Sequence, residues 1–456
     1  MVLVPCITHH SRDVAVISRN FTSALKSATR ILENHPELSF DIEEALLSLK
    51  EVGDLERRLA AFNTSRREKE TVSVAERDIS NVLASAKLSK VKAYQGLGTG
   101  ALSALPLMDR QVLQNNSSRY INQEFASQPL WETTTYGTTG FPISIYSSAG
   151  FYFDQLFLSL IKISSRVGFN AERNRVYAAH VTDTHGQRIT VNPMGRNEAT
   201  IRLIIDQFED NSIRQASRIL IDLQPCILCA RSEIIEVLAQ FSECSQYRPE
   251  LVVCSGSFLE DERRERFKHF FSCPVVNAYG LTEFGPVASE CSATPGWLHI
   301  DRSIVHHEFA AVSEVHPTRE LVLSSVSNMA MPLLRYRTGD IVQVENNMCI
   351  CGSVDPQVSM SSGRLVPTFK RRSGQLFSPT IFNGLSASLP IAKYQVIQEN
   401  INQLVVLIHP RVGALSDLIE PTLRYVQSAS RNEFDVRVGH LESYSSSNFQ
   451  RYKCMI

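Results

Sequence analysis

The second half of the chain alternates short apolar runs with amphipathic stretches. The apolar runs have the length and composition of buried strands: IRLIID (201–206), CILCA (226–230), LVVCSGS (251–257) and PVVNAYG (274–280). Apolar positions at three- and four-residue spacing predict helices between them, over 211–224, 232–241 and 260–271. Strands that alternate with helices are usually parallel, so the pattern predicts an α/β architecture whose ligands bind at the carboxyl ends of the strands.

Both ends of the chain differ from this pattern. Residues 1–100 show helical spacing and carry no chemistry that we can assign, so we expect a helical N-terminal segment of a large domain that continues over 101–361. A stretch rich in Ser, Gly and Pro, SMSSGRLVPTF, then marks a boundary. Residues 362–456 predict a small α+β domain with two strands, a helix and a third strand, over 394–398, 403–410, 415–427 and 433–441.

Composition narrows the class of protein. The 456 residues carry 46 Lys and Arg against 47 Asp and Glu, and this balance gives no indication of a nucleic-acid or membrane partner. No apolar run is long enough to span a bilayer, and the start of the chain lacks the features of a signal peptide, so we expect a cytoplasmic protein. Ten cysteines in so long a chain are too few for a disulfide scaffold, and we expect them to be reduced.

The first motif with chemical content is TTTYGTTGFPISIYSS, Thr133 to Ser148, where hydroxyl residues and glycines precede a segment that resembles a strand. Glycines expose backbone N–H groups and threonines add hydroxyl donors, which suits a loop that surrounds phosphates. It is not a Walker A loop, because no Gly-Lys-Ser/Thr follows. A polar hairpin loop is the alternative interpretation.

A second motif comes directly after the apolar residues PVV, and in a third motif a carboxylate follows a glycine at the start of a strand. NAYGLTEFGP, Asn277 to Pro286, offers an aromatic ring for a purine, a threonine hydroxyl for a phosphate and a carboxylate for Mg²⁺. LLRYRTGDIV, Leu333 to Val342, places Asp340 after a glycine, where its carboxylate can accept hydrogen bonds from both ribose hydroxyls. Each motif taken alone is also explained as a turn at the end of a strand.

In this order the three motifs resemble those of the adenylate-forming superfamily, and most closely its phenylacetate-CoA ligase and CapK-like branch. TYGTTGFP (135–142) is similar to the family's phosphate loop TSGTTGxP, AYGLTE (278–283) to its YGxTE motif, and YRTGD (336–340) matches without change. Weaker likenesses are LPLMDRQVL (105–113) to the branch's opening segment, CSGSF (254–258) to the segment beside adenine, and SGR (362–364) to the hinge motif. The resemblance implies the fold of these enzymes: a large multi-layer domain with mostly parallel sheets and a small α+β domain.

The resemblance also implies a reaction and a site. ATP and a carboxylic acid would give an acyl-adenylate and pyrophosphate, and a thiol such as CoA would then displace AMP. Glu283 would bind Mg²⁺, Thr282 would contact the α-phosphate, Tyr279 would stack near adenine and Asp340 would hold the ribose, with Arg364 nearby. The other expected nucleotide contacts come from the matched motifs: Thr135, Tyr136, Gly137, Thr138, Thr139, Gly140, Ser255, Gly256, Ser257, Asn277, Ala278 and Gly280.

The chain departs from the family pattern at four places. The phosphate loop has Tyr136 where serine or glycine is usual and Phe141 where lysine is common. The hinge motif lacks its aspartate, since GRLVPTF follows. Near the C-terminus Asn448 stands where the family has a lysine that reaches the α-phosphate, and Lys453 is the nearby substitute, with a solvated terminal lysine as the alternative interpretation. These losses leave open a weakened homologue that binds nucleotide without adenylation.

Cysteine spacing indicates a second site. Cys291 lies eight residues before His299, and Cys349 and Cys351 follow in CICG, which fits tetrahedral Cys₃His ligation of a structural Zn²⁺. A pair of reduced turn cysteines is the alternative. Spare candidates are His306, His307, Cys226 and Cys229, the last two more consistent with a buried strand.

The sequence indicates the acid substrate and the acceptor of the acyl group less clearly than the nucleotide contacts. The resemblance implies an acid pocket near Phe151, Tyr152, His180 and Ser255, although both aromatic residues also fit a core role. An aromatic or other small acid is the expectation at the level of the branch. An amine acceptor, which would make the chain an amide synthetase, remains open, as does a homodimer.

Overall fold

The computed structural model describes most of the chain after residue 90. The described residues are 31, 33–34, 90–95, 102–126, 130–135, 143–148, 151, 159–169, 176–182, 189–193, 199–205, 210–256, 259–311, 319–345, 347–360, 367–410, 413–441 and 451–456. The predicted helical segment 1–100 therefore lies almost entirely outside the described residues. No helix in the described part of the chain is long and apolar enough to cross a membrane.

A sheet of twelve described strands forms the large domain, in the order β11-β12-β13-β14-β10-β9-β8-β7-β6-β3-β5-β4. Its parallel part consists of β3 (Val176–Thr182), β5 (Ala199–Ile204), β6 (Ile227–Ala230), β7 (Leu251–Ser255) and β8 (Val275–Leu281). The crossover helices α7 (Asp210–Leu223), α8 (Ser232–Ala239) and α9 (Asp261–Phe271) begin and end close to their predicted bounds. The alternation after residue 200 thus predicted these elements correctly.

Two hydrophobic clusters cover the two faces of the parallel strands. On one face, apolar side chains of α7, α8 and α9 pack on residues such as Val181 and Val252. On the other face, α6 (Ser159–Arg166) packs through Leu160 and Ile163 on Ala178 and its neighbours. Alternate residues of each strand serve the two faces, which is why β6 and the first four residues of β7 are apolar throughout.

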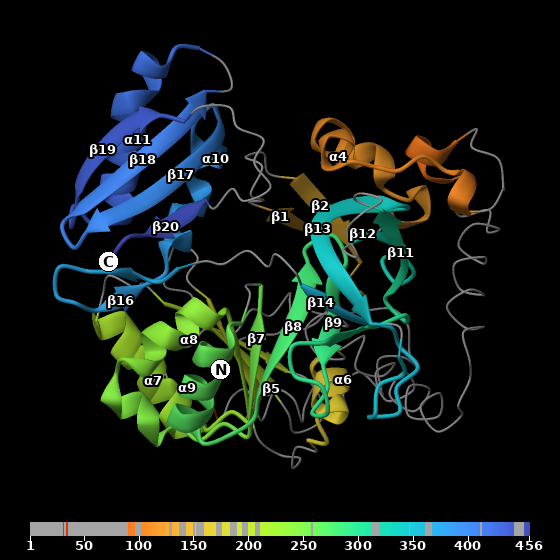
Figure 1. Ribbon diagram of the computed structural model, residues 1–456, viewed down its shortest axis with the longest axis horizontal. Coiled ribbons are helices and arrows are strands. Elements are labelled where there is room, and N and C mark those ends of the chain that lie inside the picture. Colours follow the sequence, from red (N-terminus) through yellow and green to blue (C-terminus); the bar gives the residue numbers. More distant parts are fainter. Residues whose placement is uncertain are drawn as a thin grey trace, which may run out of the picture.

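Antiparallel strands extend the parallel part on both sides, so the sheet as a whole is mixed. β4 (Ile189–Pro193) forms one edge. The other side contains β9 (Gly285–Glu290), β10 (Leu298–Ile300), β11 (Val305–Ala311), β12 (Arg319–Ser325), β13 (Tyr336–Glu345) and β14 (Gln357–Met360). A separate hairpin of β1 (Trp131–Thr135) and β2 (Ile143–Ser147) lies near α4 (Arg110–Asn116), as Figure 1 shows.

The C-terminal unit has its own sheet and its own core. The sheet has the order β19-β18-β17-β20, formed by β17 (Ile391–Asn400), β18 (Gln403–Pro410), β19 (Asp435–His440) and β20 (Tyr452–Cys454). A small hairpin of β15 (Phe369–Lys370) and β16 (Leu376–Phe377) and the helices α10 (Leu385–Ser388) and α11 (Leu415–Ala429) complete it. The three predicted strands and the long helix are present, whereas β20 and the hairpin were not predicted. The predicted boundary at 362 falls in the stretch 361–366, outside the described residues.

Short 3₁₀ helices connect these elements. They are η2 (Lys92–Tyr94), η3 (Leu102–Ala104), η4 (Ser117–Tyr120), η5 (Gln123–Phe125), η7 (Ser242–Gln246) and η8 (Pro379–Gly384). The first three of these helices pack on β13 and its neighbours through Tyr94, Leu102 and Tyr120.

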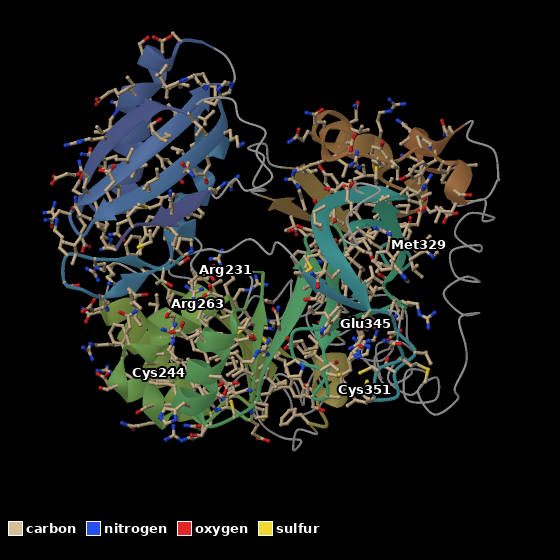
Figure 2. The ribbon with its side chains drawn as sticks, in the orientation of Figure 1. Arg231, Cys244, Arg263, Met329, Glu345 and Cys351 are labelled. Atoms are coloured by element: carbon tan, nitrogen blue, oxygen red, sulfur yellow. The ribbon has the colours of Figure 1, made fainter. Side chains whose placement is uncertain are left out.

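Polar contacts join the C-terminal unit to the helices of the large sheet. The Gln240 amide exchanges two hydrogen bonds with the backbone of Leu376, and Thr368 Oγ1 donates to Glu236 Oε2 over 2.5 Å. Arg263, labelled in Figure 2 on the side of the helices nearest the C-terminal unit, donates to Thr368 Oγ1 over 2.8 Å. The contact surface is therefore made largely by side chains of α8 and α9 and by the hairpin that follows the predicted hinge.

A buried ion pair joins α9 to the last residue of β9. The guanidinium of Arg264 on α9 donates to both carboxylate oxygens of Glu290 over 2.6 and 2.7 Å, and both residues are buried. Glu290 also accepts hydrogen bonds from the backbone N–H groups of Asn277 and Gly296, each over 2.7 Å. One carboxylate thus connects α9, β8 and the turn that leads to β10.

We expect Glu290→Gln to destabilise the fold by about 3–5 kcal/mol, because it leaves the Arg264 charge buried without its partner. Urea unfolding monitored by circular dichroism measures this change in the free energy of unfolding. Glu265→Gln is the matched control, since Glu265 pairs with Lys268 on the exposed face of the same helix and is 68% exposed. Its effect should stay within about 0.5 kcal/mol, and equal effects of the two substitutions would contradict the role of the buried pair.

Candidate functional site

Two of the predicted nucleotide motifs meet in the structure. The hydroxyl of Tyr279 on β8 donates to Asp340 Oδ2 on β13 over 2.7 Å. Three strands separate β8 from β13 in the sheet, and four strand spacings would put them about 19 Å apart if the sheet were flat. The antiparallel side of the sheet must therefore curl over, and Figure 1 shows β13 bending across the strands beside it.

The YGxTE-like motif occupies the end of β8 and the turn into β9. Asn277 to Leu281 continue the strand beyond PVV, so the motif starts inside β8, in agreement with the longer predicted strand at 274–280. A side chain at Gly280 would place its Cβ 2.9 Å from the backbone oxygen of Gly285, which explains the glycine at this close approach of the two strands. Thr282 is exposed in the turn, whereas Glu283 is buried.

Glu283 is held by two donors. Arg110 Nη1 donates to Glu283 Oε1 over 2.9 Å, and the hydroxyl of Tyr336 donates to the same oxygen over 2.8 Å. Tyr336 belongs to the YRTGD motif, so this motif contacts the other one at a second point. Sequence reasoning assigned no role to Arg110, although it lies in the LPLMDR segment that resembles the family's opening segment.

Asp340 lies within β13, not at its start as predicted. Gly339 before it has a φ of +73°, a conformation that favours glycine, and the Asp340 N–H donates to Thr338 Oγ1 over 3.0 Å. This local turn within the strand directs the Asp340 carboxylate to Tyr279.

The CSGSF segment lies beside the YGxTE-like motif. Ser255, the last residue of β7, pairs with Ala278 on β8 in the parallel register. Gly256 follows with a φ of +80°. A Cβ atom on Gly256 would lie 3.4 Å from the side chain of Arg231, which is labelled in Figure 2. The two segments that resemble adenine-binding motifs therefore end together at the carboxyl edge of the parallel strands.

Other predicted nucleotide contacts are described only in part. β1 ends at Thr135 and pairs with β2 in an antiparallel hairpin, so the phosphate-loop sequence connects two paired strands. Lys453 is exposed on β20. The remaining predicted contacts, Tyr136, Gly137, Thr138, Thr139, Gly140, Ser257, Arg364 and Asn448, lie outside the described residues.

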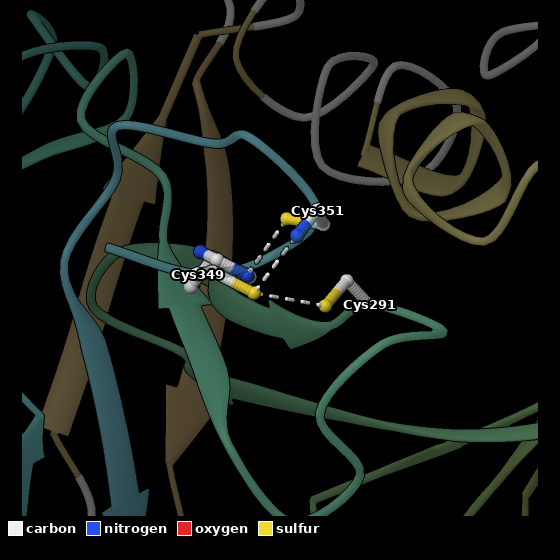
Figure 3. Close-up of side chains that lie close together, drawn as sticks. Cys291, Cys349 and Cys351 are labelled. Carbon is white, nitrogen blue, oxygen red and sulfur yellow. Dashed lines mark hydrogen bonds between the residues drawn. The ribbon is translucent and has the colours of Figure 1, made fainter. Parts of the chain in front are cut away.

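The structure brings the four predicted Cys₃His residues together. The ligand atoms of Cys291, His299, Cys349 and Cys351 all lie within 4.8 Å of one another. Figure 3 shows the three cysteine side chains converging, with Cys291 Sγ 3.7 Å from Cys349 Sγ. Cys351 Sγ lies 3.5 Å from His299 Nε2. Two thiolates at 2.3 Å from one tetrahedral zinc would be about 3.8 Å apart, so the donor set fits this metal.

Neighbouring groups orient these side chains. His299 Nδ1 lies 3.2 Å from the backbone oxygen of Asp355, which leaves Nε2 directed to the cysteines. Burial opposes ionisation of Cys291, but hydrogen bonds with Thr294 and His299 lower the pKa of its thiol. For Cys349 burial is likewise outweighed, and the Cys351 N–H helps to lower the pKa of the Cys349 thiol. Thiolates are the form that binds metal.

The spare metal candidates lie elsewhere. Cys229 is buried in β6, as expected, and burial raises the pKa of its thiol. Cys226 is buried just before that strand. His306 and His307 lie on β11, and burial beside His306 and Arg302 lowers the pKa of His307 to about 4. Within the described residues none of these four joins the Cys₃His cluster.

Three of the acid-pocket candidates, Phe151, His180 and Ser255, lie among the described residues, whereas Tyr152 lies outside them. Phe151 is buried, which agrees with a core role. His180, near the carboxyl end of β3, has a pKa lowered to about 4 by burial and by the positive charge of Arg202. Its Nε2 is buried and has no hydrogen-bond partner among the described residues. His180 is therefore a neutral imidazole with an unused polar atom.

The mixed α/β fold, with its large sheet and smaller C-terminal sheet domain, is that of the adenylate-forming ligases. No protein-family model and no curated protein sequence matches the chain. A solved structure of 2-hydroxyisobutyryl-CoA ligase with 2-HIB-AMP and CoA, in the thioesterification state, aligns with a TM-score of 0.54 and 14% identity over 84% of this chain and 91% of that chain.

The same enzyme in the postadenylation state, in complex with R3-HIB-AMP, aligns with a TM-score of 0.50 and 14% identity over 85% of this chain and 91% of that chain. At such identity the likeness concerns the fold. The closer relation to the phenylacetate-CoA ligase branch stays a prediction.

We expect the Cys₃His cluster to bind one zinc ion per chain, measured by elemental analysis of the purified protein. Cys349→Ser should lose the metal and lower the melting temperature, because the cluster joins the turn after β9 to the turn before β14. Cys454→Ser, at a half-buried cysteine outside the cluster, should retain the metal. A wild-type protein that takes up no zinc after reduction and reloading would contradict the assignment.

Proposed function

We propose that the chain is an AMP-forming acid ligase, which activates a carboxylic acid with ATP and transfers the acyl group to a thiol such as CoA. The hydrogen bond between Tyr279 and Asp340 carries this proposal, because it joins two motifs that come from distant parts of the chain. The Tyr279 ring for the purine and the Asp340 carboxylate for the ribose are then adjacent. The Glu283 carboxylate lies in the turn that follows β8. The shared fold agrees with the same reaction.

The strand that carries Tyr279 also offers a group for the base. Asn277 Oδ1 is buried and accepts no hydrogen bond from the described residues, and such an atom is costly unless a ligand or a water satisfies it. The amino group of adenine is a donor of the required kind. The motif residues therefore supply stacking, a base contact and a ribose contact from one edge of the sheet.

The reaction has two displacements. In the first, a carboxylate oxygen of the acid attacks the α-phosphorus of ATP, the P–O bond to pyrophosphate breaks, and an acyl-adenylate forms. In the second, a thiolate attacks the acyl carbon and the C–O bond to AMP breaks. Positioning and charge stabilisation supply most of the catalysis. Glu283 would hold Mg²⁺, which neutralises charge on the phosphates when bound.

The chemistry of His180 indicates which class of acid the pocket would accept. A neutral imidazole near the carboxyl end of β3 can exchange a hydrogen bond with a polar substituent of the substrate. Because it carries no charge, it can also lie beside an apolar ring. This supports a small acid, aromatic or hydroxylated, over a long fatty acid. The role of His180 as a pocket residue rests on its place in the sheet and on its unused nitrogen.

A second candidate function is a nucleotide-binding homologue with weak adenylation. The observation that favours it is the tail, where Asn448 replaces the expected lysine and Lys453 is exposed on a paired strand. Loss of one cation that contacts the transition state typically lowers the rate on the order of 10²- to 10³-fold.

Pyrophosphate release tests the proposal. The protein is incubated with ATP, Mg²⁺ and a panel of aryl, hydroxy and alkyl acids, with hydroxylamine to trap the acyl-adenylate and with CoA or an amine as the acceptor. We expect release that depends on the acid, and thioester formation with CoA. Amide formation instead would identify an amide synthetase. Nucleotide binding without release would favour the second candidate function.

We expect Asp340→Asn to weaken nucleotide binding roughly 10- to 100-fold, because a charged acceptor for the ribose hydroxyls is lost. Isothermal titration with AMP measures the affinity. Asp435→Asn is the matched control, since Asp435 is 78% exposed on β19 of the C-terminal unit. An Asp340→Asn protein with wild-type AMP affinity would remove Asp340 from the proposed site.

A further inference from the structure

Among the described residues, the donors to Glu283 reach one of its two carboxylate oxygens. Arg110 Nη1 and the Tyr336 hydroxyl both donate to Oε1, over 2.9 and 2.8 Å. Among the described residues no group donates a hydrogen bond to Oε2. The Glu283 side chain is 5% exposed and that of Arg110 20%, so the pair is nearly removed from solvent. One oxygen is thus fixed by the protein, and the other is left for a ligand.

The backbone brings Arg110 to this position. The Met108 N–H donates to the Arg335 oxygen, and the Arg337 N–H donates to the Met108 oxygen, each over 2.9 Å. These bonds attach Met108 to β13 as a parallel bridge opposite Tyr336. Arg110 follows two residues later, at the start of α4. Both donors to Glu283 therefore come from one backbone junction, which fixes them relative to each other.

Electrostatics favours this arrangement over a bare carboxylate. A buried carboxylate is costly without a paired cation, and a guanidinium keeps its charge at any physiological pH. The hydrogen bond between the two charged groups is stronger than a neutral one and restricts the rotation of the carboxylate. Partners that orient a metal-binding carboxylate commonly change metal affinity 10- to 100-fold when they are removed.

We infer that Arg110 is a positioning residue for the divalent metal of the nucleotide: it holds Glu283 through Oε1 so that Oε2 is presented as the metal ligand. The inference rests on the proposed function, because it assigns the metal to the Glu283 carboxylate. It gives the LPLMDR segment a chemical role. It also places a permanent cation next to the Glu283 carboxylate in a chain whose phosphate loop has Phe141 in place of a lysine.

Electron paramagnetic resonance with Mn²⁺ tests this inference on the full chain. Free Mn²⁺ is titrated against protein saturated with α,β-methylene-ATP, which cannot release pyrophosphate. Arg110→Gln should weaken Mn²⁺ binding at least tenfold, while affinity for AMP without metal stays unchanged. Arg110→Lys keeps the positive charge but not the planar donor geometry of the guanidinium, so it should recover part of the lost Mn²⁺ affinity. Tyr336→Phe removes the second donor to Oε1 and should shift Mn²⁺ affinity in the same direction by less.

Arg119→Gln is the matched control, since Arg119 is an exposed arginine just beyond the same helix and should leave Mn²⁺ affinity unchanged. Wild-type Mn²⁺ affinity in Arg110→Gln, or tighter binding, would overturn the inference, the latter because Arg110 would then compete with the metal. A wild-type protein that binds neither AMP nor the analogue would reject the proposed function and this inference with it. If Arg110→Gln does not fold, Arg110→Lys and Tyr336→Phe decide the question through the same titration.

Discussion

The Arg264–Glu290 ion pair is the interaction on which both candidate sites depend. Glu290 ends β9, and its carboxylate binds α9 through Arg264 and β8 through the Asn277 N–H. It also fixes the turn after β9 through the Gly296 N–H, and Cys291 is the next residue along the chain. A buried pair of this kind fixes the positions of the elements it joins more than it stabilises the fold, because the cost of removing both charges from water offsets much of their attraction. The nucleotide motif on β8 and the cysteine cluster therefore share one anchor.

The curl of the antiparallel side joins the rest of the site. β13 brings Asp340 to Tyr279 and Tyr336 to Glu283, while the chain between β13 and β14 contains Cys349 and Cys351. One long strand thus has nucleotide motifs at its beginning and cysteine ligands just beyond its end. A structural metal here would fix the far end of β13, and with it the register that positions Asp340. The proposed zinc site supports the proposed nucleotide site through this strand.

The sequence predicted the parts of the molecule that depend on local pattern. The parallel strands and α7, α8 and α9 follow from apolar periodicity, and the Cys₃His cluster follows from spacing typical of metal ligands. Several antiparallel strands of the large sheet, such as β9, β10 and β12, and also β20 were missed, because short strands give little periodicity and are stabilised by neighbours distant in sequence. Arg110 was missed for the same reason: its partner is 173 residues away, and only the bridge at Met108 brings the two together.

The position of Lys453 constrains its proposed role. Lys453 lies in a parallel ladder opposite Ile397, so its backbone is fixed to β17 and would approach a nucleotide only together with the C-terminal sheet. The contacts that a rotation of the C-terminal unit would break are polar and include both buried and exposed groups. Thr368 donates to the buried Glu236, whereas Asp210, which pairs with Arg371, is 55% exposed. Exposed pairs contribute little because water replaces them readily. If Lys453 serves the proposed adenylation, the contact at Glu236 has to break while the pair at Asp210 costs little, and the rate would then depend on how often the whole unit rotates.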